Sequence, residues 1–501
     1  MCPTRNLQKS SQTRLFLIED RANPDNVPSY ESLARALGLS WAQGDITPIR
    51  VPDPNSYGKF VTVDTIRGQQ GLPTISIENR LTRDLSTLLG LVRKGCAFDV
   101  QLHAGACEDP RDFNGGWEKI YVLENAVATS YDTNELGALD ADQNAVVNET
   151  VPLSGDDWYE IKRVVGSELA ASQIVQQIVG VVICDSRQCG ECGISSNGCE
   201  KIFAVTMSAG GSPGLPAEVI FSADGGATVE DTTITSIGAT EDPTGLACSG
   251  IYLAVISNES LSLHYAPLAD ILAGTETWAE IATGFVAAKG PNAIFSLGSV
   301  FNWVVGDGGY IYFSDDITSG VTVQSAGSQT IENLADIHGS DEFNLVAVGA
   351  NNAVVFTNDG GTNWASVTGP APGVALTTVF VKSDQVWLVG TAGGQLFFTQ
   401  DGGVNWEEKA FSGSGAGSVN DIQFSTPTIG YMATQTATPA GRVYRTIDGG
   451  FSWYILPEAA GLSLPTSDEI NSIAACSENP NLAFAGGLGA NSVDGILIKI
   501  G

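Results

Sequence analysis

The sequence predicts a mainly β protein, in which an N-terminal α+β or β-barrel-like domain is followed by a β-propeller of about seven blades. Two observations carry this prediction. A motif containing Asp-Gly-Gly recurs through the second half of the 501-residue chain at intervals typical of propeller blades. Glycine is frequent, with 58 residues, and only 16% of residues are charged, which favours tight turns between strands over long solvated helices.

The charge distribution divides the chain near residue 200. The whole chain has 24 Lys+Arg and 56 Asp+Glu, a formal net charge of -32, and residues 201–501 hold only seven of the basic residues. We therefore predict a β-rich assembly domain over 1–165, a connector with a cysteine cluster over 166–200, and a propeller over 201–501. Such an acidic chain argues against specific nucleic-acid binding. We expect no secretory signal, since the start of the sequence has no apolar run of 7–15 residues before a small-residue cleavage site, and no membrane insertion, since no run of 18 apolar residues occurs.

The repeated motif has three complete copies, FTNDGGTNW (356–364), FTQDGGVNW (398–406) and RTIDGGFSW (445–453). Two shorter copies, FSADGG (221–226) and FSDD (313–316), lie upstream, and Trp278 marks a degraded copy between them. The residues predicted to form these turns are Asp224, Asp316, Asp359, Gly360, Gly361, Trp364, Asp401, Gly402, Gly403, Trp406, Asp448, Gly449, Gly450 and Trp453.

Each motif residue has a structural role in a hairpin. Glycine supplies the positive φ of a tight turn, and the Asp carboxylate can accept hydrogen bonds from backbone groups of the turn. The Trp then covers the seam with the next blade. We therefore interpret these residues as structural and not catalytic. A last unit at about 464–500 lacks a fourth strand, and the segment IKRVV (161–165) is a candidate for closing the ring.

The motif resembles the Asp-box of sialidase-type propellers, and its pairing with strands such as Trp303–Gly306 and Trp387–Gly390 resembles the photosystem II assembly factor propellers. Sialidases bind the substrate carboxylate with three arginines. Residues 201–501 contain two, Arg442 and Arg445, and His264 and His338 stand alone in the sequence. We therefore predict that the protein is not an enzyme and needs no cofactor or metal.

Four of the nine cysteines cluster within sixteen residues, with the spacing C-x4-C-x2-C-x6-C. Two disulfides, a zinc site and free thiols are all compatible with this spacing, and an iron–sulfur cluster is the last alternative. A further local disulfide is expected around strand 97–105. The cysteines considered for disulfides are Cys96, Cys107, Cys184, Cys189, Cys192 and Cys199.

The N-terminal domain has the pattern of several strands and one packed helix. Leucines on one face predict an amphipathic helix over 80–95, and 29–41 also has helical character. Strands are predicted at 46–52, 59–68, 73–80, 97–105, 118–131 and 147–155.

This domain resembles, in general style over about 10–165, phage tail-tube-type virion proteins. The resemblance implies a structural subunit of a phage tail tube, assembled in the host cytoplasm and located in the virion. Its partners would be copies of itself in a ring or tube and other virion proteins. The propeller would be an outward-facing decoration, with a glycan or protein of the host surface as a candidate contact. Two alternatives are a glycan-binding or glycan-acting propeller and a protein-binding propeller of the assembly-factor kind.

Overall fold

The computed structural model divides into two compact units, residues 1–163 and 164–501. In the second unit it describes β12, residues 164, 174, 176–184, 199–208, 215–238, 241–411, 417–435, 441–456, 469–488 and 495–501. In the first unit it describes the strands given below and residue 155.

The first unit is an antiparallel β structure. Nine strands form one sheet with the path β2-β1-β7-β8-β10-β6-β3, to which β11 adds beside β8 and β9 beside β10, while β4 and β5 pair with each other. The strands are β1 (Thr13–Glu19), β2 (Glu31–Leu33), β3 (Ala36–Ala42), β4 (Ile49–Pro52), β5 (Phe60–Asp64), β6 (Thr74–Arg80), β7 (Phe98–Ala104), β8 (Lys119–Ala128), β9 (Asp132–Thr133), β10 (Asn148–Ser154) and β11 (Asp157–Lys162).

The six strands predicted in this unit are confirmed as β4, β5, β6, β7, β8 and β10. The helical interpretation of 29–41 is wrong, because this segment forms β2 and β3. Residues 36–42 pair along β6, and the hydrogen bonds of that ladder outweigh a local helical pattern. The predicted helix over 80–95 and the predicted pair Cys96 and Cys107 lie outside the described residues.

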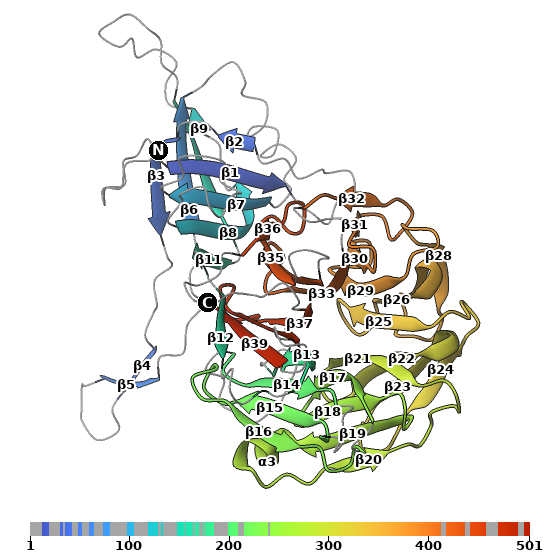
Figure 1. The fold of residues 1–501 in the computed structure, drawn as a ribbon. Coiled ribbons are helices and arrows are strands. Elements are labelled where there is room, and N and C mark those ends of the chain that lie inside the picture. Colours follow the sequence, from blue (N-terminus) through green and yellow to red (C-terminus); the bar gives the residue numbers. More distant parts are fainter. Residues whose placement is uncertain are drawn as a thin grey trace, which may run out of the picture. The chain divides into compact units, whose positions relative to one another are not determined.

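The second unit is a seven-bladed propeller, which confirms the predicted fold and blade number. Seven four-stranded antiparallel sheets follow one another around a ring (Figure 1). Blades 1 to 3 are β13 (Ile178–Ile183), β14 (Ile202–Thr206), β15 (Glu218–Ser222), β16 (Glu230–Thr233); β17 (Pro243–Ser249), β18 (Tyr252–Ser257), β19 (Ser262–Pro267), β20 (Ala279–Ile281); and β21 (Pro291–Leu297), β22 (Phe301–Gly306), β23 (Tyr310–Ser314), β24 (Thr322–Ala326).

Blades 4 to 6 repeat the same order from the inner to the outer strand. They are β25 (Leu334–Gly339), β26 (Leu345–Gly349), β27 (Ala353–Thr357), β28 (Ala365–Thr368); β29 (Leu376–Val381), β30 (Trp387–Thr391), β31 (Leu396–Thr399), β32 (Glu407–Lys409); and β33 (Ser418–Phe424), β34 (Gly430–Gln435), β35 (Arg442–Thr446), β36 (Tyr454–Ile455).

Blade 7 closes the ring with strands from both ends of the unit. It joins β37 (Glu469–Ala475), β38 (Ala483–Leu488) and β39 (Gly495–Ile500) to β12 (Gly166–Leu169), which lies beside β39 (Figure 1). The expectation that 161–165 closes the ring is therefore wrong, since Ile161 belongs to β11 and pairs with Ile120 in the first unit. The propeller also begins before residue 201, because β12 and β13 lie within the segment expected to be a connector.

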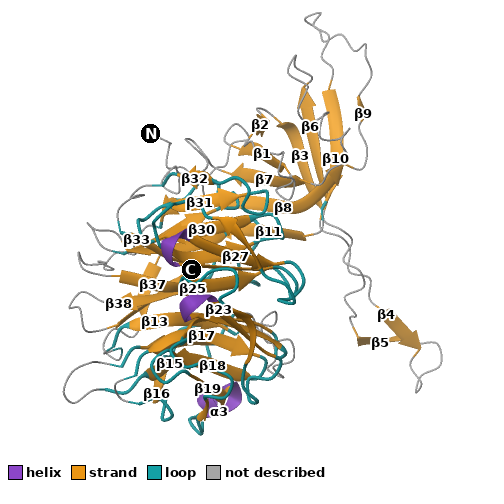
Figure 2. Cartoon of the chain, turned by 90° about the vertical axis from the view of Figure 1, so that its right-hand side faces the viewer, coloured by secondary structure: helices purple, strands orange, loops and turns teal. Residues whose placement is uncertain are grey.

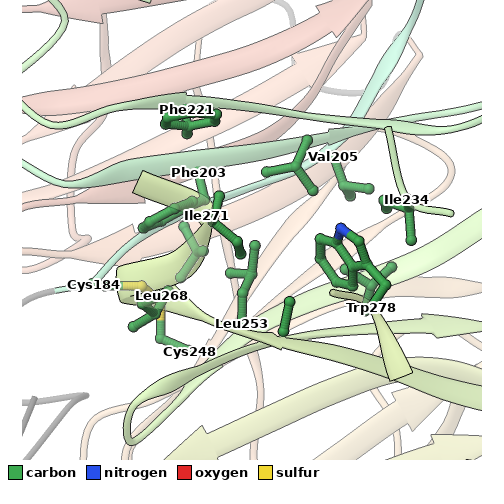
Figure 3. Packing of buried hydrophobic residues seen from close by; sticks show 14 of the residues in the cluster. Cys184, Phe203, Val205, Phe221, Ile234, Cys248, Leu253, Leu268, Ile271 and Trp278 are labelled. Atoms are coloured by element: carbon green, nitrogen blue, oxygen red, sulfur yellow. A yellow bond between two sulfur atoms is a disulfide. The ribbon is translucent and has the colours of Figure 1, made fainter. Parts of the chain in front are cut away.

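Blade 2 differs from the others between its third and fourth strands. A short helix, α3 (Leu268–Ala273), stands where blades 1, 4, 5 and 6 have the Asp-Gly-Gly turn (Figure 2). Leu268 and Ile271 of this helix belong to the same buried cluster as Trp278 (Figure 3). Trp278 directly precedes the fourth strand of its blade, as the motif tryptophans do in blades 4, 5 and 6, which agrees with its interpretation as a degraded copy.

The hydrophobic core is distributed over the seams between blades. One cluster joins blades 1 and 2, further clusters join blades 2 and 3, 3 and 4, 4 and 5, and 5 and 6, and another joins blades 7 and 1. Trp303 and Trp387 are each 1% exposed, as expected for core positions. Each pair of neighbouring blades is therefore stabilised by burial of apolar side chains between their two sheets.

Candidate functional site

The first strands of the seven blades enclose a central channel of about 250 Å³. Each of these strands has a register shift near its beginning, where one residue bulges out of the ladder. The bulged residues are Val179, Thr244, Asn292, Ala335, Thr377, Asn420 and Asn471. The same backbone device thus repeats seven times around the channel.

In five blades the bulged residue bonds its own blade to the next one. Each side chain donates to a carbonyl of the following first strand, namely that of the residue preceding its bulge. The bonds are Thr244 to Pro291 (2.9 Å), Asn292 to Leu334 (2.9 Å), Thr377 to Val419, Asn420 to Ile470 (2.8 Å) and Asn471 to Ile178 (2.9 Å). Only Val179 and Ala335 lack a donor group. These five polar side chains of the channel therefore bond neighbouring blades to each other.

Two carboxyl groups lie in the channel wall, on blades 4 and 6. Asp336 Oδ2 accepts from the backbone N–H of Val379 (2.9 Å), and Asp421 Oδ2 accepts from Ile473 N–H and Ser472 Oγ (both 2.9 Å). Burial, reinforced by the charge of Asp421, raises the pKa of Asp336 to about 7. Burial also raises the pKa of Asp421. The cost of desolvating these carboxylates outweighs the hydrogen bonds that they accept.

His338 of blade 4 lies in a row of aromatic rings that crosses the seams of blades 3 to 6. Its ring centroid is 4.8 Å from that of Phe295 and 4.3 Å from that of Phe380, which lies 4.9 Å from Phe424. Its Nδ1 accepts from the backbone N–H of Val381 (3.1 Å), so the neutral ring carries its proton on Nε2. Burial lowers the pKa of His338 to about 3, and the side chain stays neutral at physiological pH.

The predicted turn residues form the same hydrogen-bond pattern in four blades. In blade 5, Thr399 Oγ1 donates to Asp401 Oδ1 (2.9 Å) and accepts from Gly403 N–H (3.0 Å). Asp401 also accepts from the backbone (2.8 Å) and the side chain (2.6 Å) of Asn405. The equivalent bonds recur around Asp224, Asp359 and Asp448. Gly403 has φ +83°, as such a turn requires.

These hydrogen bonds keep the turn carboxylates ionised. Bonds from Thr228 lower the pKa of Asp224 to about 2, and those from Asn363 lower the pKa of Asp359. Asp316, in the copy without glycines, accepts instead from Thr318 (2.9 and 2.7 Å) and Ser319 (2.9 Å), closer along the chain. In each of these turns the carboxylate accepts hydrogen bonds from residues of the same turn and so stabilises it.

The motif tryptophans pack toward the preceding blade and not toward the next one. Trp406 Nε1 donates to Thr368 O of blade 4 (3.1 Å), and Trp364 joins a cluster with Trp303 of blade 3. Trp453 packs with Leu388 of blade 5. Each tryptophan side chain therefore covers the seam between its own blade and the blade that precedes it in the sequence.

The first glycine of the motif also fixes a second turn of the same blade. Its N–H donates to a carbonyl in the turn between the first and second strands. These bonds are Gly225 to Glu200 (2.9 Å), Gly360 to Phe343 (3.1 Å), Gly402 to Gln385 (2.9 Å) and Gly449 to Thr428 (2.7 Å). Both turns at this end of the blade are therefore held as one unit.

The two arginines in the described part of the propeller, Arg442 and Arg445, do not form an anion clamp. Both lie on β35, and Arg445 is fully buried. Its Nη2 donates to Pro480 O and Asn481 Oδ1 of blade 7 (both 3.0 Å), and its guanidinium lies 5.4 Å from the Tyr431 ring centroid. Arg445 therefore joins blade 6 to blade 7.

Two disulfides join blade 1 to both of its neighbours. Cys184, after β13, bonds Cys248 of β17 in blade 2 (Figure 3), and Cys199, before β14, bonds Cys476 after β37 in blade 7. The expectation of bonds or a metal site within the cluster is wrong for Cys184 and Cys199, because their partners lie in adjacent blades. Cys189 and Cys192 lie outside the described residues.

In the described part of the chain, no group of three or more His, Cys, Asp or Glu side chains could hold a metal ion, and no helix has the length and apolar character to cross a membrane. Sequence reasoning missed the five bulged Thr and Asn residues that bond neighbouring blades around the channel. Its signal is a Thr or Asn recurring near the start of five first strands, which an alignment of the blades on their second strands would have revealed.

The chain is similar to the family described as photosynthesis system II assembly factor YCF48, whose model matches residues 318–464. Similar solved structures include "YCF48 bound to D1 peptide" (17% identity, TM-score 0.48, 68% of this chain and 97% of the other). Another is YCF48 from Cyanidioschyzon merolae (15%, 0.48, 67% and 98%), and a third is U3-55K (12%, 0.47, 67% and 98%). No curated protein sequence matches the chain. The family match covers three complete copies of the repeated motif and agrees with the propeller fold.

Proposed function

We propose that the propeller is a non-catalytic protein-binding module, of the assembly-factor kind. The observation that carries this proposal is the match of residues 318–464 to the assembly-factor family. This segment includes blades 4, 5 and 6 with all their turns. The channel supports the non-catalytic part of the proposal, because five of its bulged residues and both of its carboxyl groups bond neighbouring blades.

The experiment is a comparison of ligand classes on one protein. The full-length chain is labelled and applied to an array of tiled peptides and, in parallel, to a glycan array. The proposal expects saturable binding to a limited set of peptides and no binding to glycans. The matched control is the same chain unfolded in urea with its disulfides reduced, which should lose the peptide signal.

Two results would overturn the proposal. Binding to glycans without binding to peptides would support the alternative of a glycan-binding propeller. Release of sugar from a bound glycan would show that the protein is an enzyme. A rigid propeller makes no distinction between these ligands by its fold alone, so the ligand class must be measured.

The expected role as a phage tail-tube subunit, assembled with copies of itself and located in the virion, stays a prediction. Neither the family match nor the similar structures support it. Electron microscopy and sedimentation of the full-length chain test it directly. Rings or tubes are expected for such a subunit, whereas a monomer at high concentration would contradict it.

A further inference from the structure

One end of the propeller carries exposed apolar side chains on blades 2 to 5, and the one in blade 5 is Val404 (75% exposed). In an antiparallel four-stranded blade, the turn from the first to the second strand and the turn from the third to the fourth lie at the same end. We call this end the turn face. Ile251, Val300 and Phe343, in the first of these turns in blades 2, 3 and 4, are 49%, 49% and 55% exposed. We call these three residues the apolar trio.

Hydrogen bonds hold the backbone at two members of the apolar trio, Ile251 and Phe343. Ile251 O accepts from Leu268 N–H (2.8 Å), and Phe343 O accepts from Gly360 N–H (3.1 Å). The side chain of Asp341 accepts from the N–H groups of Phe343 (2.8 Å) and Asn344 (2.9 Å). An exposed apolar side chain on such a fixed turn loses little conformational freedom when a partner covers it.

The three turns are neighbours. Gly250 and Ser299, which directly precede Ile251 and Val300, approach so closely that a Cβ on Gly250 would lie 2.6 Å from the Cβ of Ser299. Blade 3 reaches blade 4 through Gln324 Nε2, which donates to Gly360 O (3.2 Å), the residue whose N–H holds Phe343. The apolar trio therefore belongs to one continuous stretch of surface.

The surroundings of the apolar trio are acidic. Over residues 243–368, all described, Lys289 is the only lysine or arginine, and it lies in the connection between blades 2 and 3 at the opposite end. The turn face of the same three blades carries seven carboxylates, and these are Asp270, Glu276, Asp315, Asp316, Asp341, Glu342 and Asp359. A ligand that covers the apolar side chains thus meets a strongly negative rim.

We infer that the turn face of blades 2 to 4 docks a cationic segment of a partner protein, whose apolar side chains cover the trio while its Lys or Arg side chains face the carboxylates. This inference rests on the proposed protein-binding function. Charge complementarity selects the occupant: a second copy of this acidic surface and an anionic membrane would both be repelled. Apolar anchors surrounded by charged residues are the usual anatomy of a protein-binding patch.

The test uses the full-length chain and fluorescent peptides in anisotropy titrations. The probe is an amphipathic peptide of Leu and Lys. Two control peptides are used: in one, Gln replaces Lys and removes the positive charge, and in the other, Ser replaces Leu and removes the apolar side chains. The variant I251S/V300S/F343S removes the apolar trio. The matched control, L215S/I331S, changes two side chains at the opposite end that are 43% and 82% exposed. A third variant, D315N/E342Q, removes two rim charges outside the Asp341 bonds.

The Leu-Lys peptide should bind the wild type and the control equally, and the trio variant about tenfold or more weakly. The D315N/E342Q variant should bind more weakly at low salt and show a smaller salt dependence. Equal binding by the trio variant and the control would overturn the inference, as would equal binding of the Gln peptide.

Phosphatidylserine vesicles and sedimentation at high concentration test the other occupants, and trio-dependent binding or dimerisation there would also overturn the inference. If array peptides bind but ignore the trio, this inference fails while the proposed function stands. If no peptide binds at all, the proposed function fails.

Discussion

Removal of the Cys199–Cys476 disulfide should cost more stability than removal of Cys184–Cys248. The first bond connects residues 277 apart in sequence and joins blade 7 to blade 1, whereas the second connects residues 64 apart and joins blades 1 and 2. A cross-link restricts the unfolded chain more when the loop that it closes is longer. The variants C199A/C476A and C184A/C248A compare the two.

The loop lengths give the size of the difference. The chain-entropy relation assigns about 5.6 kcal/mol to the longer loop and about 4.3 kcal/mol to the shorter one. Measured effects are usually smaller, about 2–4 kcal/mol, so the difference of roughly 1.3 kcal/mol is the useful quantity. The four sulfur positions are all buried, with exposures of 2% and 0% in one pair and 9% and 2% in the other, so the Ala substitutions leave comparable cavities.

Urea unfolding, followed by tryptophan fluorescence, provides the measurement. C199A/C476A should unfold at a lower urea concentration than C184A/C248A, and dithiothreitol should bring the wild type below both. A loss in C184A/C248A that equals or exceeds the loss in C199A/C476A would refute the reasoning, because loop length would then not govern the contribution of these bonds.

Three further predictions concern buried and turn side chains, each measured by urea unfolding against pH. In D401A the turn loses its acceptor, and we expect a loss of about 1–3 kcal/mol relative to the exposed control D384A. Since the pKa of Asp401 is lowered in the fold, this loss should shrink below pH 4, and a constant loss would contradict the assignment. In D336N the buried charge is absent. The pKa of Asp336 is about 7 in the folded protein and 3.8 for an ordinary aspartate, so the wild type loses stability as the pH rises from 4 to 7. The free energy of unfolding of D336N should therefore increase relative to that of the wild type by at most about 1.4 kcal/mol per pH unit over this range. An unchanged difference would show that Asp336 is not protonated there. His338 has the opposite sign: its folded pKa of about 3 lies below 6.5, so stability present above pH 6.5 falls on acidification, and H338Q should lose less stability than the wild type from pH 6.5 to 4.5. A parallel decline of both proteins would refute this.

The repeated turns allowed the propeller to be predicted from the sequence, because each turn needs particular residues. Thr399, Asp401 and Gly403 each have a bond or a backbone angle that few other residues supply. Blade 2 was harder to recognise, since a helix replaces its turn and only Trp278 remains. An upstream strand was expected to close the ring, but Gly166–Leu169 was not identified as that strand, because its partner is at the far end of the chain and local patterns do not contain the pairing.

The candidate site was less predictable. The spacing of Cys184 and Cys199 suggested a local cluster, yet their partners are brought close only by the ring. The raised pKa of Asp336 likewise depends on its enclosure by other blades. Exposure of Ile251, Val300 and Phe343 depends on turn geometry, so an apolar residue in the sequence gave no indication of it.

The position of β12 affects how this protein is made on the ribosome. Ser167 of β12 and Lys499 of β39 lie 332 residues apart and bond each other in blade 7. At a synthesis rate of about 5–20 residues per second, β39 follows β12 by roughly 15–70 s. Throughout this interval the nascent chain carries an unpaired strand edge, a feature that attracts other strands. Chaperones that cover this edge during translation would therefore increase the yield of closed rings.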